Sequence, residues 1–218
     1  MGSGSNLSYF SGDNRPVESV SWYDALVYCN KRSIEEGKTP CYTIGGKTNP
    51  SEWGDVPTSN NETWNEADCN FSANGYRLPT EAEWEYFARG GNVTNSGQTN
   101  YSGSITIGDV AWYFENALNE LASSDANYGT HQVKTKAKNS LKLYDMSGNV
   151  WEWCWDWYGS ISASTSSSGA PSGSRRVFRG GSWRNDADYC SVVFRGTGDP
   201  CARSIDGGVG FRVVRSAD

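Results

Sequence analysis

Residues 143–159 read LYDMSGNVWEWCWDWYG, a turn followed by the richest aromatic run of the chain. Ser-Gly-Asn at 147–149 favours the turn, and four tryptophans then occupy alternate positions from 151 to 157. Side chains alternate between the two faces of a strand, so the indoles are expected on one face and the residues between them on the other. We interpret this tryptophan face as core, although an aromatic sugar-binding platform is an alternative for the same residues.

Two segments carry the signals of helices. Ser21 is expected to cap a helix that continues to about residue 33, because apolar residues follow it at helical spacing. A second helix is expected in GYRLPTEAEWEYFARGG (75–91), with a start at Pro79-Thr80-Glu81 and an end at Gly90-Gly91. Short strand-like pieces and Gly-rich turns follow towards the C-terminus. The pattern predicts an α+β fold with two helices, short antiparallel strands and long irregular loops.

The composition excludes several classes of function. The 218 residues suit a single domain, 1–218, and 36% of them are hydrophobic, which is enough for a core. A net charge of −6 disfavours nucleic acid as a partner. The longest apolar runs fall far short of a transmembrane span, and the first ten residues lack the features of a signal peptide.

Histidine and cysteine limit the chemistry further. His131 is the single histidine, so a multi-histidine metal site is excluded, and we expect it to be a solvated loop residue. The six cysteines contain no Cys-x-x-Cys pair, which disfavours structural zinc. Cys29 and Cys154 are expected to be buried free thiols.

The motifs at 75–91 and 143–159, with RVFRGGSW (176–183) and GVGFRVVR (208–215), resemble the formylglycine-generating enzyme (sulfatase-modifying factor) family. PVESVSWYDALVYC at 16–29 is similar to the N-terminal helix of that family. The resemblance implies a C-type-lectin-like fold of the formylglycine-generating-enzyme subtype. Family members normally carry a strand-bearing segment before the first motif, so the resemblance suggests a chain that is trimmed at its N-terminus.

The enzymatic members of the family oxidise a substrate cysteine with copper held by two cysteines. Counted from GGSW, those positions correspond to Asn185 and Cys190 here. One thiolate does not supply the two-sulfur site that Cu(I) prefers. The resemblance therefore implies a chain with no catalytic residues and no required cofactor, and a copper-dependent oxidase acting on a peptide cysteine through Cys190 is the alternative.

The C-terminal segment resembles the variable proteins of diversity-generating retroelements, of the treponemal type. In those proteins a fixed framework holds positions that adenine-directed mutagenesis rewrites. The framework would comprise Gly180, Gly181, Ser182, Trp183, Ala187, Cys190, Val192, Val193, Arg195, Pro200, Arg203, Val209, Gly210, Phe211 and Arg212. The variable ligand-binding set within 184–206 would comprise Arg184, Asn185, Asp186, Asp188, Tyr189, Ser191, Phe194, Gly196, Thr197, Gly198, Asp199, Cys201, Ala202, Ser204, Ile205 and Asp206.

The composition of these positions agrees with that interpretation. Mutation of the adenines in an AAC or AAT codon cannot produce Lys, Glu, Gln, Met or Trp, and none of the sixteen positions carries one. The five types make up 33 of the first 183 residues, so chance alone leaves sixteen positions free of them only about 4% of the time. The segment shows no hydrophobic period, and Gly196, Gly198 and Pro200 are expected to break any regular element. Such a segment is typical of an exposed binding surface, in which Tyr189 and Phe194 would serve as anchors.

The acidic turn has two interpretations. Family members can bind calcium through groups that correspond here to Asp145, Gly148, Val150 and Glu152, and hard oxygen donors suit that ion. In the alternative, Asp145 caps the turn and Glu152 pairs with a nearby arginine.

Together these features predict a non-enzymatic, monomeric ligand-binding variable protein. The family role implies export to a bacterial cell surface and an unknown ligand, expected to be a protein on another cell or on a host. An accessory domain with one fixed partner is a third possibility.

Overall fold

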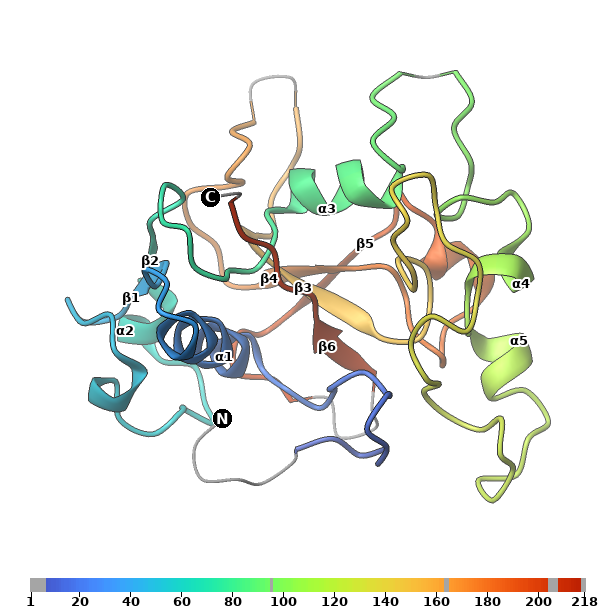
Figure 1. Cartoon of the computed structure of the whole chain (residues 1–218), viewed down its shortest axis with the longest axis horizontal. Coiled ribbons are helices and arrows are strands. Elements are labelled where there is room, and N and C mark those ends of the chain that lie inside the picture. Colours follow the sequence, from blue (N-terminus) through green and yellow to red (C-terminus); the bar gives the residue numbers. More distant parts are fainter. Residues whose placement is uncertain (1–6, 95, 163–164, 204–207, 217–218) are drawn as a thin grey trace.

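The computed structural model describes residues 7–94, 96–162, 165–203 and 208–216. Its centre is a four-stranded sheet in the order β5-β4-β3-β6, with α1 beside one part of it and α3 beside another (Figure 1). The strands are β3 (Trp151–Trp157), β4 (Arg176–Arg179), β5 (Arg195–Gly198) and β6 (Val209–Phe211). All pairs are antiparallel except β3 with β6, which run parallel.

Strand β3 forms where the alternating tryptophans predict it, and both of its faces are covered. The indole face packs against α1 (Trp22–Glu35): the Trp22 and Trp155 rings lie 5.3 Å apart, and Trp153 Nε1 donates to the Val20 carbonyl at 3.0 Å. The opposite face packs against α3 (Glu81–Ala88), where Cys154 lies in a cluster with Trp84. The indoles therefore lie largely in the core, and β3 is packed between α1 on one face and α3 on the other.

Both predicted helices are confirmed, together with the residues that begin them. Ser21 caps α1 in a capping box with Asp24, and Thr80 caps α3 in the same way with Glu83. These reciprocal bonds satisfy backbone N–H groups that a helix start leaves without partners. Trp84, on α3, is fully buried.

Smaller elements complete the fold. Strands β1 (Tyr42–Thr43) and β2 (Asp68–Cys69) pair antiparallel, and the short helices between them are η1 (Pro50–Glu52) and α2 (Glu62–Asn65). Trp53 and Trp64 are buried here and contact one another edge to face. One-turn helices α4 (Ile107–Val110) and α5 (Phe114–Ala117) lie in the long loop before β3, and η2 (Ala187–Cys190) lies after β4. The expectation of two helices therefore holds only for the helices longer than one turn.

Two expectations from sequence are wrong. His131 is 9% exposed rather than solvated, because its ring stacks on Trp112 with centroids 3.6 Å apart. The segment after residue 184 is not free of regular structure, since it contains η2 and β5. Gly196 and Gly198 lie within β5, where their lack of side chains lets the Phe178 ring pack on the strand. No helix of the described residues is long and apolar enough to cross a membrane.

Candidate ligand-binding surface

The predicted variable positions differ in exposure. Thirteen of the sixteen are described; Ser204, Ile205 and Asp206 lie outside the described residues. The exposed positions are Arg184, Asp186, Asp188, Tyr189, Asp199 and Ala202. The half-buried positions are Asn185, Ser191, Phe194, Thr197, Gly198 and Cys201, and Gly196 is buried. The exposed variable positions thus lie around η2 and just after the end of β5.

The predicted framework is largely interior. Trp183, Cys190 and Val192 are each at most 2% exposed, and Pro200 is buried as well. Val193 departs from this rule, because 59% of its surface is exposed. Residues that alternate with the exposed positions therefore point mostly into the core, which is the arrangement expected of a scaffold that carries changeable side chains.

Two framework arginines fix the second half of the segment. Arg195 forms a bidentate pair with Glu81 at the start of α3, with Nε–Oε1 and Nη2–Oε2 distances of 2.6 and 2.7 Å. Arg203 forms a second bidentate pair with Asp24 in α1, with distances of 2.7 and 2.9 Å. Planar bidentate pairs of this kind hold both position and orientation. Helix α3 thus holds the start of β5, and helix α1 holds the loop that follows β5.

A third arginine supports the segment from below. Arg179 in β4 is fully buried and donates to the carbonyl oxygens of Val192 and Phe194, while it also pairs with Glu85 of α3. Its role was not visible in the sequence, because it depends on three segments that only the fold brings together. A buried arginine that holds two carbonyl groups restricts the backbone beneath Tyr189 and Phe194.

An aromatic row runs from the surface to the sheet. The exposed Tyr189 ring contacts Phe194, with centroids 4.7 Å apart, and Phe194 contacts Trp151 at 6.0 Å. Trp151 in turn contacts Phe178 at 4.9 Å. The Tyr189 ring is therefore held in place by Phe194, which itself packs on Trp151. An aromatic side chain held in this way loses little conformational freedom on binding.

Two neighbouring segments border the surface and were not predicted. The Val192 N–H donates to the Asn100 carbonyl at 2.9 Å, and the Phe114 N–H donates to the Asn185 carbonyl at 3.0 Å. Burial raises the pKa of Tyr101, and the Asp188 carboxylate adds to the rise, so this tyrosine lies close to the predicted site. Nothing local in the long polar loop signals these contacts.

Asn185 and Cys190 both lie against Ser182. Asn185 Oδ1 accepts from the Ser182 N–H and hydroxyl, at 3.0 and 2.6 Å, and so closes the turn. Cys190 Sγ lies 4.0 Å from the Ser182 carbonyl, and burial raises the pKa of this thiol to about 12. A thiol protonated at neutral pH is a poor metal ligand and nucleophile. All six cysteines are free, and Cys29 and Cys154 are buried as predicted.

The two carboxylates of the acidic turn have hydrogen-bond partners within the protein. Both oxygens of Glu152 accept hydrogen bonds, from Arg212 at 3.0 and 2.8 Å and from Trp84 Nε1 at 2.8 Å. Asp145 Oδ2 accepts from the Lys134 N–H at 2.8 Å. Among the described residues, no group of three histidine, cysteine or acidic side chains could hold a metal ion. The contacts match the alternative interpretation, in which Glu152 pairs with an arginine.

Fold and site together define a C-type-lectin-like domain of the formylglycine-generating-enzyme subtype. The family model described as "Sulfatase-modifying factor enzyme 1-like domain" matches residues 2–217, and the chain belongs to this family.

Several known proteins and solved structures are similar to most of this chain. Treponema denticola variable protein 1 has a similar structure, with a TM-score of 0.80 and 39% identity, covering 96% of this chain and 77% of that chain. The chain is 41% identical to "Chaperone protein LppX" of Paenibacillus barcinonensis, covering 98% of this chain and 74% of that protein. It is 35% identical to the formylglycine-generating enzyme of Streptomyces coelicolor, covering 72% of this chain but 52% of the enzyme.

Proposed function

We propose that this chain is a non-enzymatic ligand-binding protein whose segment 184–206 is a diversified binding surface. The observation that carries the proposal is the division of this segment between exposed and buried positions. Of the thirteen described positions predicted to vary, six are exposed and six are half-buried, whereas most of those predicted to stay fixed are in the core or in ion pairs with α1 and α3. The similarity to a treponemal variable protein supports the same function.

The chemistry of the surface suits recognition of a protein. Tyr189 is 41% exposed, Val193 is 59% exposed, and the carboxylates of Asp186 and Asp188 lie beside them. Aromatic anchors surrounded by polar groups are typical of protein interfaces. The proposed partner is a protein on another cell or host surface, bound by a monomer exported to the bacterial surface as a product of a diversity-generating retroelement.

A copper-dependent oxidase acting through Cys190 is the second candidate, and family membership is what favours it. The buried Cys190 thiol and the position of Asn185 disfavour it, because one protonated thiol does not make a two-sulfur copper site.

One experiment separates the two functions. Purified chain is titrated with Cu(I) in competition with a chromogenic chelator and incubated with a peptide that carries the sulfatase-type cysteine motif. The ligand-binding function predicts that the chain does not take up one equivalent of Cu(I) from the chelator and that no aldehyde product forms. Cys190→Ser should give the same result. Stoichiometric copper and turnover that Cys190→Ser abolishes would refute the proposal.

A further inference from the structure

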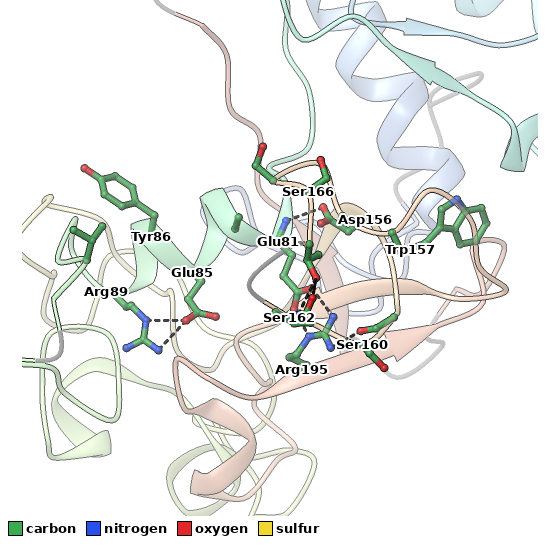
Figure 2. A pocket seen from close by; sticks show the side chains of 18 of the residues that line it. Glu81, Glu85, Tyr86, Arg89, Asp156, Trp157, Ser160, Ser162, Ser166 and Arg195 are labelled. Carbon is green, nitrogen blue, oxygen red and sulfur yellow. Dashed lines mark hydrogen bonds and ion pairs between the residues drawn. The ribbon is translucent and has the colours of Figure 1, made fainter.

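A pocket of about 1110 Å³ lies between β2 and the loop that joins β3 to β4, and none of the described variable positions lines it. Its volume is close to the upper end of the range for small-molecule sites in proteins. Figure 2 looks into the neighbouring pocket around Glu81 and Arg195 and shows the Trp157 side chain pointing away from both of them. Trp157 lines both pockets, so it lies in the wall between them.

Three aromatic side chains line one side of this larger pocket. Trp155 and Trp157 are half-buried there, and Phe71 is 37% exposed. The Phe71 and Trp155 rings meet edge to face, with centroids 6.4 Å apart. The Arg176 guanidinium lies 5.2 Å from the centre of the Trp155 ring and 3.4 Å from that of Trp157. These contacts join the three rings, through Arg176, into one aromatic wall.

Arg176 fixes this wall from beneath. Its side chain is 2% exposed, and its Nη1 and Nη2 groups donate to the carbonyl oxygens of Trp155 and Asn65, at 2.8 and 2.9 Å. Its guanidinium also lies against the buried Trp22 ring, 3.8 Å from the centroid. One buried side chain thus ties β4 to β3 and to the end of α2. The wall is therefore formed before a ligand binds, which lowers the ordering cost of binding.

The polar groups of the pocket favour an uncharged ligand that is rich in hydroxyl groups. Glu66 and Asp68 are exposed at its rim, and their charges oppose an anion. The charge of Arg176 beneath the aromatic wall opposes a cation. Ser166 and Ser168 add hydroxyl groups on the side of the loop.

A sugar ring matches both sides of this pocket. The C–H groups on the face of a pyranose carry a small positive partial charge, which the negative face of an aromatic ring attracts. Its hydroxyl groups donate to carboxylates, in hydrogen bonds that are stronger than those between neutral groups.

We propose that this pocket binds a neutral oligosaccharide, with one pyranose ring stacked on Phe71 beside Trp155 and a hydroxyl group donating to Asp68. Trp151 and Trp153 are buried, so only the last two indoles of the tryptophan run line the site. The site is separate from the diversified surface and does not depend on the function proposed for it.

The test uses the full chain at pH 7 and cellotriose as the probe, because the substituents of its rings are equatorial and leave both faces of each ring apolar. Sorbitol is the control ligand, since it carries hydroxyl groups but has no ring. Binding is followed by NMR shifts of the Trp155 and Trp157 indole N–H groups. A dissociation constant of about 1 mM is expected for cellotriose, well within the limit for a ligand of this size. Sorbitol should give no saturable shift.

Phe71→Ala should weaken cellotriose binding about tenfold, because the ring on which the sugar stacks is lost. Tyr86→Ala is the matched control: Tyr86 has a similar exposure, 43%, but lines the neighbouring pocket, so its loss should leave binding unchanged. If Phe71→Ala does not fold, Asp68→Ala replaces it, because Asp68 is exposed and its loss should also weaken binding about tenfold.

Three results would overturn the proposal. The first is the absence of a saturable shift up to about 20 mM cellotriose. The second is equal binding of sorbitol and cellotriose. The third is unchanged binding to the pocket variant that folds; if Tyr86→Ala weakens binding instead, the sugar lies in the neighbouring pocket.

Discussion

Replacement of Arg203 by methionine tests whether the framework holds the binding segment. Arg203 makes two charge-assisted hydrogen bonds to Asp24, at 2.7 and 2.9 Å. Burial alone would raise the pKa of Asp24, yet the hydrogen bonds from Arg203 and Ser21 hold it below its usual value. Arg203→Met keeps most of the apolar stem and leaves a carboxylate that is 4% exposed without its cation.

The size of the effect follows from burial. Removal of one partner from a fully buried pair costs about 3–5 kcal/mol. The Arg203 side chain is 23% exposed, so we expect a loss nearer 2–3 kcal/mol in the free energy of unfolding. With a urea m-value of about 2–3 kcal/mol per molar for a chain of this size, the midpoint should fall by about 1 M.

The assay is urea unfolding at pH 7 followed by tryptophan fluorescence. Arg175→Met is the matched control, because Arg175 forms an exposed pair with Asp199 at 3.3 Å. An exposed pair contributes at most about 1 kcal/mol, so the control should lose far less stability. Equal losses for the two variants would show that Arg203 is not an anchor of the segment.

Three further outcomes follow from the packing. Gly196→Ala should lower the free energy of unfolding in urea by about 1–3 kcal/mol, because the new Cβ would overlap the Phe178 ring. The exposed control Ala202→Ser should change it by less than about 0.5 kcal/mol. Equal effects of the two substitutions would show that Phe178 does not pack closely on Gly196. Burial raises the pKa of Asp156 to about 7, so this carboxyl binds its proton more tightly in the folded state. Its contribution to the free energy of unfolding should therefore fall by up to about 4 kcal/mol as the pH rises from 4 to 7. Asp156→Asn should lack this dependence of stability on pH. Burial lowers the pKa of His131 to about 4, so its contribution to the free energy of unfolding should be lost as the pH falls from 6.5 to 4, by up to about 3 kcal/mol. A His131→Phe variant that loses as much stability over the same pH range would refute this.

The elements that the sequence predicted well are those with strong local signals. The alternation at 151–157 predicted β3. Ser21 as a cap and the Pro79-Thr80-Glu81 sequence predicted where α1 and α3 begin. Each signal depends on neighbours in sequence, so no tertiary information is needed to interpret it. The family motifs also located the framework positions, and the structure shows that most of these are buried.

The remaining features depend on contacts between distant segments. Glycines in a polar stretch of sequence usually indicate a loop. Gly196 and Gly198 are strand residues instead, because Phe178 of the neighbouring strand β4 packs over them. His131 is buried because Trp112 lies parallel to it. The buried Arg179 is matched by carboxylates of α3 almost a hundred residues earlier. None of these partners can be inferred from local pattern.

The central claim is that exposed positions of the C-terminal segment are diversified for binding while the buried framework stays fixed. Sequencing of the 3′ end of this gene and its flanking DNA across related isolates tests it most directly. The account predicts differences concentrated at exposed positions such as Asp186, Asp188 and Tyr189, beside a near-copy of the segment that carries adenines at the same codons. It also predicts no change at Trp183, Arg195 or Arg203. An invariant segment without such a copy, or changes spread evenly over exposed and buried positions, would contradict it.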